Sequence, residues 1–129
     1  MLNSTTPFGI GTDIIDIMRF KVKPLKNNLN FYKKIFSDSE IKYCQKFRSS
    51  HEHFAGKFAI KESVIKAIPE KISFLDICTS HSKNKPKILL NNELNRKYKF
   101  LVSVSHEKVY AIAFVIAFKS ENNTKSSSK

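Results

Sequence analysis

Residues 54–68, FAGKFAIKESVIKAI, are the stretch of sequence that decides the fold. They contain no proline, and their apolar side chains recur at the three- and four-residue spacing of a helix. Ser49 and Ser50 precede the segment as candidate N-caps, and Pro69 follows it, where a helix has to end. The pattern predicts one long helix that the rest of the chain covers.

Glu62 lies at the edge of the apolar stripe that Phe54, Phe58 and Ile65 form on this helix at about 100° per residue. A carboxylate beside a buried face is costly unless a cation or hydrogen-bond donors meet it. One interpretation is an ordinary (i, i+4) pair with Lys66 on a core helix, a contact that contributes only about 0.2–0.5 kcal/mol. The other interpretation is a functional site, and the helix alone does not choose between them.

Residues 8–17, FGIGTDIIDI, predict a first strand in which Gly9, Gly11 and Asp13 share one face. Glycines within a strand usually mark the close approach of another backbone or a ligand. Here they clear space beside an aspartate in an otherwise apolar strand. The alternative is that Asp13 ends the strand and caps the helix that follows it.

The remaining segments predict short helices followed by short strands. Residues 37–40, SDSE, form a capping box that opens a helix to about residue 47. Beyond Pro69, segments rich in β-branched and aromatic residues predict four strands, at 72–80, 86–90, 100–106 and 110–118. In the last of these, alanines occupy one face and bulky side chains the other. The fold class expected is α+β, with the central long helix packed on a mainly antiparallel sheet.

The composition is that of one globular domain with 129 residues, 41% of them hydrophobic and 26% charged. No apolar run approaches the roughly 18 residues that cross a bilayer, and the N-terminal segment lacks the features of an export signal. Cys44 and Cys78 have no metal-ligand spacing, which favours free thiols in a reducing cytoplasm. We expect a cytoplasmic protein with one domain at 1–118 and a disordered polar tail at 119–129.

Three ionisable residues stand out as candidates for chemistry: Asp13, Glu62 and His106, the last at the end of the strand at 100–106. Two carboxylates in a lysine-rich chain suit Mg²⁺, which binds one or two protein carboxylates together with water and phosphate oxygens. The residues therefore point to metal-assisted phosphoryl or phosphodiester chemistry. They do not name the substrate.

Five segments together carry a resemblance to a known family: GIGTDI at 9–14, FAGKFAIKES at 54–63, Lys66-Ala67, VSHE at 104–107 and Tyr110-Ala111. In this order and spacing they resemble the holo-acyl-carrier-protein synthases, which are short, single-domain 4′-phosphopantetheinyl transferases. The resemblance implies transfer of the 4′-phosphopantetheine group of coenzyme A to a serine of an apo-acyl carrier protein, in fatty acid biosynthesis and lipid metabolism. Adenosine 3′,5′-bisphosphate is the other product.

The resemblance also implies roles for individual residues. Asp13 and Glu62 match the Mg²⁺ ligands, and either of them could deprotonate the attacking serine, with Glu62 favoured. Lys66 matches the lysine that stabilises the leaving phosphate. The residues expected to contact coenzyme A are Lys57, Lys61, Lys66, Ser105 and His106. Lys57 stands where many members have arginine, and Lys83-Asn84 stands where members tend to have Asn-Gly.

Arg19 matches a family arginine that docks the acidic carrier protein, and Lys26 would extend that basic surface. Charges at the rim of such an interface mainly affect the association rate and its salt dependence. The resemblance further implies a homotrimer with active sites between subunits, to which the bulky face of residues 110–118 could contribute.

The net charge of +12 supports a competing hypothesis, a basic nucleic-acid-binding module without catalysis. That hypothesis predicts affinity that falls steeply with salt and needs no Mg²⁺. Against it, the lysines are spread along the chain and no recognisable RNA or DNA motif is present. A third hypothesis is a scaffold that has lost its chemistry, and the intact acid pair argues against it. We therefore expect neither nucleic acid nor membrane as a partner.

Overall fold

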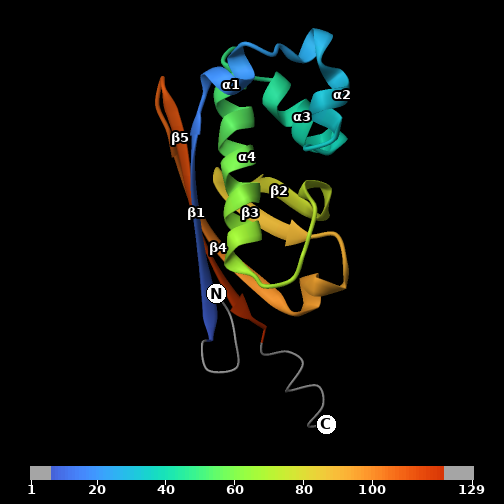
Figure 1. Ribbon diagram of the computed structural model, residues 1–129, viewed down its shortest axis with the longest axis vertical. Coiled ribbons are helices and arrows are strands. Elements are labelled where there is room, and N and C mark those ends of the chain that lie inside the picture. Colours follow the sequence, from blue (N-terminus) through green and yellow to red (C-terminus); the bar gives the residue numbers. More distant parts are fainter. Residues whose placement is uncertain (1–6, 121–129) are drawn as a thin grey trace.

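A helix of 18 residues, α4 (Ser50–Ala67), runs through the middle of the molecule in the computed structural model, which describes residues 7–120 (Figure 1). Ser49 occupies the N-cap position, but its side chain makes no capping hydrogen bond. The helix is buried almost all round, including every residue from Phe54 to Lys61. The prediction of one long helix that the rest of the chain covers is confirmed, and the buried surface is wider than the stripe of Phe54, Phe58 and Ile65.

On one side, α4 packs against a three-stranded antiparallel sheet in the order β1 (Phe8–Asp16), β5 (Tyr110–Lys119) and β4 (Tyr98–His106). The alanine face predicted for the last strand lies under the helix, and Ala111, Ala113 and Ala117 are at most 1% exposed. The opposite face of the sheet carries large apolar side chains that are exposed in this chain. Small side chains on β5 thus let the helix and the sheet approach closely.

Gly11 is the closest point of that approach. A Cβ atom at Gly11 would lie 1.8 Å from the carbonyl oxygen of Ser63 in α4. The prediction that the strand glycines mark an approaching backbone is confirmed here. Asp13 does not end the strand, which continues to Asp16. It is Asp16 whose Oδ1 accepts the Met18 N–H at 3.0 Å, at the start of α1.

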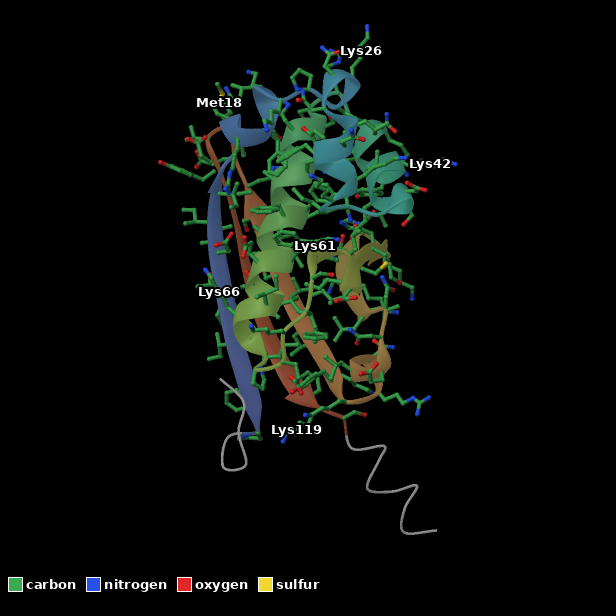
Figure 2. All side chains as sticks on the ribbon, turned by 45° about the vertical axis from the view of Figure 1, so that its right-hand side comes forward. Met18, Lys26, Lys42, Lys61, Lys66 and Lys119 are labelled. Atoms are coloured by element: carbon green, nitrogen blue, oxygen red, sulfur yellow. The ribbon has the colours of Figure 1, made fainter. Side chains whose placement is uncertain are left out.

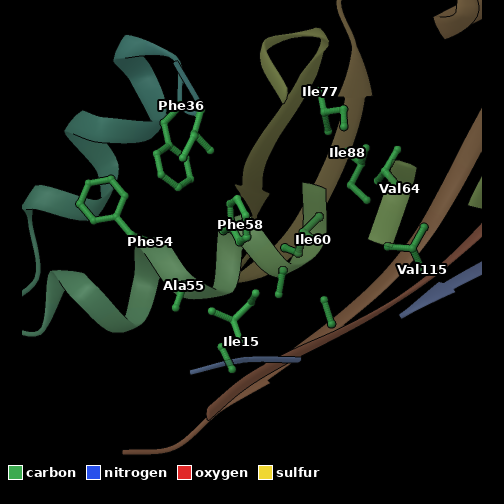
Figure 3. Packing of buried hydrophobic residues seen from close by; sticks show 14 of the residues in the cluster. Ile15, Phe36, Phe54, Ala55, Phe58, Ile60, Val64, Ile77, Ile88 and Val115 are labelled. Atoms are coloured by element: carbon green, nitrogen blue, oxygen red, sulfur yellow. The ribbon is translucent and has the colours of Figure 1, made fainter. Parts of the chain in front are cut away.

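On its other side, α4 is covered by short helices and a hairpin. The helical part consists of α1 (Met18–Lys21), η1 (Leu25–Asn27), α2 (Leu29–Lys33) and α3 (Asp38–Gln45). The Ser37–Glu40 capping box that opens α3 is confirmed. Aromatic rings join this layer to the helix, because the ring centroids of Tyr32 and Phe36 lie 4.6 and 5.0 Å from that of Phe54. Figure 3 shows the Phe36 and Phe54 side chains in this packing.

The hairpin consists of β2 (Ile77–Ser82) and β3 (Lys85–Leu90). The first of these strands was expected to begin at residue 72, but η2 (Phe74–Asp76) precedes it there. The Asp76 carboxylate accepts hydrogen bonds from the Ser73 N–H and hydroxyl at the start of η2. A third short element, η3 (Glu93–Arg96), leads into β4. The predicted α+β architecture is confirmed, and the part of the tail at 121–129 lies outside the described residues. Within residues 7–120, no helix combines the length and apolar character of a membrane span.

Candidate active site

Asp13 of β1 and Lys66 of α4 meet where the strand passes the end of the helix. The Lys66 Nζ atom lies 3.1 Å from Asp13 Oδ1 and 3.0 Å from the Thr12 carbonyl oxygen. The other carboxylate oxygen, Asp13 Oδ2, is buried and has no hydrogen-bond partner within residues 7–120. A buried carboxylate oxygen without a donor is energetically unfavourable, and a cation would satisfy it.

Glu62 lies one helical turn before Lys66 and is half-buried. The (i, i+4) pair considered for these two residues does not form, because Lys66 pairs with Asp13 instead. Within residues 7–120, Glu62 makes no hydrogen bond or ion pair, so its carboxylate remains available to a ligand. The part of the chain that the structure describes holds no cluster of three or more metal-ligating side chains. Two carboxylates with an unsatisfied oxygen fit Mg²⁺, which takes most of its ligands from water and phosphate.

A pocket of about 180 Å³ opens beside the N-terminal half of α4. Lys57 lies in its wall, about 13 Å along the helix axis from Lys66 at 1.5 Å per residue. The Lys57 Nζ atom donates to the Thr79 hydroxyl at 2.9 Å and to the Thr79 carbonyl at 3.3 Å. The residues that line the pocket come from α3, α4, β4 and the hairpin: Tyr43, His53, Gly56, Lys57, Ile60, His81, Asn84, Val104 and His106.

Two histidines of this pocket, His53 and His81, were missed by the sequence analysis. The His53 ring stacks on Phe47 with centroids 3.7 Å apart, and the His81 ring stacks on Tyr43 at 4.4 Å. Burial is the main cause that lowers the pKa of both imidazoles, and neighbouring cationic groups add to it. The HEH triplet at 51–53 is a sequence signal that could have identified His53. His81 is brought to the pocket by the β2–β3 hairpin, which the sequence around it does not indicate.

Ser105 and His106 are adjacent in the chain and were both predicted to contact coenzyme A, but the structure places them differently. His106 lines the pocket, with its ring 5.4 Å from His53 and its Nδ1 3.4 Å from Glu52 Oε1. Ser105 points to the outer face of the sheet, where it lines a shallow hollow together with Tyr110 and His106. His106 therefore borders both cavities, and Ser105 borders only the outer one.

Lys61 requires a correction. Its side chain is completely buried in the middle of the molecule, whereas Lys66 lies beside β1 (Figure 2). The Nζ atom lies 2.8 Å from Glu40 Oε1 and 2.8–2.9 Å from three backbone carbonyl oxygens. An ammonium group has three N–H donors, so these acceptors leave none for a ligand. The predicted contact of Lys61 with coenzyme A is wrong in this structure, and its role is structural.

Arg19 belongs to α1 and Lys26 to η1. Figure 1 shows α1 at the end of the molecule where α4 begins, and Figure 2 shows Lys26 at the same end. The Arg19 guanidinium carbon lies 5.2 Å from the centre of the Phe58 ring, a distance that allows a cation–π contact. Lys26 lines a groove whose other walls include Leu25, Leu29 and Ile41. Basic and apolar side chains thus lie together on this surface, close to the N-terminal half of α4.

Comparison with known proteins shows what this chain resembles. Residues 9–115 match the family model described as the 4′-phosphopantetheinyl transferase superfamily. A holo-[acyl-carrier-protein] synthase of Ehrlichia chaffeensis is 41% identical over 118 residues, which cover 85% of this chain and 95% of that protein. The corresponding protein of Clostridium tetani is 36% identical, with 84% and 93% covered. The crystal structure of Helicobacter pylori holo-[acyl-carrier-protein] synthase in complex with coenzyme A matches with a TM-score of 0.71 and 36% identity. That match covers 84% of this chain and 98% of the other.

Proposed function

The chain belongs to the 4′-phosphopantetheinyl transferase superfamily, and from this premise we propose how its own residues carry out the transfer. It acts as a holo-[acyl-carrier-protein] synthase that moves 4′-phosphopantetheine from coenzyme A to a serine of an apo-acyl carrier protein. The serine oxygen attacks the phosphorus that carries the pantetheine arm. The bond from that phosphorus to adenosine 3′,5′-bisphosphate breaks, and the serine proton passes to a carboxylate.

The observation that carries the proposal is the buried Asp13 Oδ2 beside Lys66, which has no hydrogen-bond partner among the described residues 7–120, with Glu62 available one turn away. Asp13 and Glu62 would hold Mg²⁺, which neutralises charge on the pyrophosphate when bound. Lys66, whose side chain is about half exposed, can turn toward the leaving phosphate and stabilise its charge. Glu62 is our first choice as the base that accepts the serine proton, and Asp13 is the second.

The pocket beside Lys57 and His106 supports binding of the remainder of coenzyme A. It offers the Lys57 ammonium group, which can form a charge-assisted hydrogen bond to phosphate, and three imidazoles whose N–H groups can also donate. Arg19 and Lys26 would receive the acidic carrier protein at the end of the molecule where α4 begins. A cytoplasmic location is part of this proposal.

We also propose that the chain forms a homotrimer through the outer face of its three-stranded sheet. Large apolar side chains on that face are 44–60% exposed: Phe8, Ile10, Ile14, Leu101, Tyr110, Ile112 and Phe114. A patch of this kind is unusual on a monomer and is typical of an interface. Sedimentation equilibrium measures the oligomeric state, and a monomer at all concentrations would contradict the proposal.

Mass spectrometry of an apo-acyl carrier protein tests the transfer itself. We expect the mass of one phosphopantetheine group to be added only when coenzyme A and Mg²⁺ are both present. Glu62→Gln should lower turnover by about 100-fold or more, because it removes a metal ligand and the favoured base. Glu93→Gln, an exposed change of the same type in η3, should leave turnover unchanged. Near-normal activity of Glu62→Gln would show that its assigned role is wrong.

A further inference from the structure

A buried chain of polar groups connects the start of α3 to the pocket. Its centre is Glu40, which is 1% exposed. Glu40 Oε1 accepts the Ser37 N–H at 2.8 Å and contacts Lys61 Nζ at 2.8 Å. Glu40 Oε2 accepts the Thr79 N–H at 2.8 Å and the Thr79 hydroxyl at 2.7 Å. Both carboxylate oxygens are therefore fully used, and they fix Thr79 through its backbone and its side chain.

The direction of the hydrogen bonds around Thr79 follows from the groups that surround it. An ionised carboxylate only accepts, an ammonium group only donates, and a hydroxyl has a single proton. The Thr79 hydroxyl must therefore donate to Glu40 and accept from Lys57, whose Nζ lies 2.9 Å away. The Thr79 carbonyl accepts a second Lys57 proton at 3.3 Å.

Lys57 has one N–H left once Thr79 has taken two. Within residues 7–120 its Nζ has no further hydrogen-bond partner, and the side chain forms part of the pocket wall. The Tyr43 ring lies 4.8 Å from the same nitrogen and limits its movement on the pocket side. A lysine ammonium group is a point charge at the end of a flexible four-carbon stem, so the direction of its N–H groups depends on contacts like these.

We propose that Thr79, held by Glu40, is a positioning residue that directs the Lys57 ammonium group into the pocket to bind a phosphate of coenzyme A. This inference rests on the proposed function, because that function supplies the phosphate. It adds that the affinity for coenzyme A depends on a hydroxyl that does not itself line the pocket. The competing explanation is that Thr79 only satisfies a buried lysine and contributes to stability alone.

Thr79→Val tests the proposal because it removes the hydroxyl, keeps the volume and retains the backbone N–H that binds Glu40. We expect the KM and the calorimetric Kd for coenzyme A to rise about tenfold, as for loss of one directed hydrogen bond to a charged group. The kcat and the KM for the carrier protein should change less than about twofold. Thr79→Ser keeps the hydroxyl and should restore the wild-type Kd.

A double-mutant cycle with Lys57→Met separates positioning from a general structural effect. If Thr79 acts through Lys57, adding Thr79→Val to Lys57→Met should not weaken coenzyme A binding any further. Thr79→Ala, which adds no methyl group in place of the hydroxyl, serves as the second truncation if the valine variant does not fold. An unchanged Kd in a folded variant that lacks the hydroxyl would overturn the proposal, and so would equal losses for coenzyme A and carrier protein.

The same measurements distinguish failure of this inference from failure of the proposed function. A wild-type protein that transfers phosphopantetheine while Thr79→Val binds coenzyme A normally would overturn the inference alone. A wild-type protein that binds coenzyme A but modifies no carrier protein would contradict the function, and the calorimetric comparison would still decide the role of Thr79. A wild-type protein that binds no coenzyme A would overturn both.

Discussion

Replacing Gly11 by alanine should separate the central helix from the first strand. The added Cβ would lie 1.8 Å from the Ser63 carbonyl oxygen, 2.7 Å from its carbon and 3.2 Å from the Ala67 backbone nitrogen. All three atoms belong to the backbone of α4, so no side-chain rotation relieves the overlap. Comfortable contact between heavy atoms needs about 3.5 Å, so the helix and the strand must move apart by on the order of 1.5 Å.

Such a displacement affects the packing of α4 against the three-stranded sheet. The alanine face of β5 lies under the same helix, with Ala113 and Ala117 at most 1% exposed, and a gap there would leave both without their present contacts. Overpacking a well-packed interior usually costs about 1–3 kcal/mol. Because the clash involves only backbone atoms, we expect a loss of about 3 kcal/mol for Gly11→Ala. The contact of Lys66 with Asp13 should weaken as well, since it joins the same two elements.

Urea unfolding followed by circular dichroism measures this loss, and Gly56→Ala provides the matched control. A Cβ at Gly56 would make only ordinary contact, 3.5 Å from Val104 Cγ2, and Gly56 lies inside α4. Alanine in a helix interior is favoured over glycine by about 0.5–1 kcal/mol, so the control should be more stable than the wild type. If Gly11→Ala unfolds within about 0.5 kcal/mol of the wild type, the tight packing inferred between strand and helix is wrong.

Three further predictions concern acid stability, the hairpin turn and the cysteines. Burial raises the pKa of Glu40, but Lys61 and the hydrogen bonds to the carboxylate outweigh it and hold the pKa below its ordinary value of 4.5. The stability that Glu40 contributes is therefore present above pH 4.5 and lost as the pH falls through its lowered pKa. The free energy of unfolding of Glu40→Gln, measured by urea unfolding at several pH values, should depend less on pH across that window than the wild-type value does. Lys83 has φ = 52° in the hairpin turn, so Lys83→Asn should raise the unfolding free energy by about 0.5–1 kcal/mol, and no gain in urea unfolding would count against this turn. Burial raises the pKa of Cys44 to about 12, so iodoacetamide should label the partly exposed Cys78 and spare Cys44 until the protein unfolds, as peptide mass spectrometry would detect.

The alternation of buried and exposed side chains along the strands could be predicted from the sequence, because the two-residue period of a strand is the same whatever element packs against it. The glycines of β1 predicted the close approach of another backbone or a ligand, and at Gly11 it is the backbone of α4 that approaches, since an added Cβ would lie 1.8 Å from the Ser63 carbonyl oxygen. The carboxylate of Asp13 was noticed for the same reason, since it is out of place in an apolar strand. The sequence also identified Ser37 and Glu40 as a capping box, which is a local motif.

The second role of Glu40 could not be predicted, because it depends on segments far away in the chain. Its carboxylate meets Lys61 and Thr79, which are 21 and 39 residues further on. Nothing local to a capping box indicates burial at 1% exposure or an ion pair. Lys61 was misassigned for the same reason: a lysine beside an expected phosphate site resembles a ligand until its buried acidic partner is known.

The three lysines of α4 show how position on one helix decides what identical side chains do. Lys57 and Lys61 are four residues apart, so they share a face, and that face turns toward Glu40 and Thr79. Lys66, five residues further on, points to a different side and meets Asp13 of β1. The helix thereby links the pocket and the carboxylates of the candidate metal site through one rigid element. A change that tilts α4 should therefore disturb both ends of the site together, whereas a change at Thr79 should affect only the end that holds Lys57.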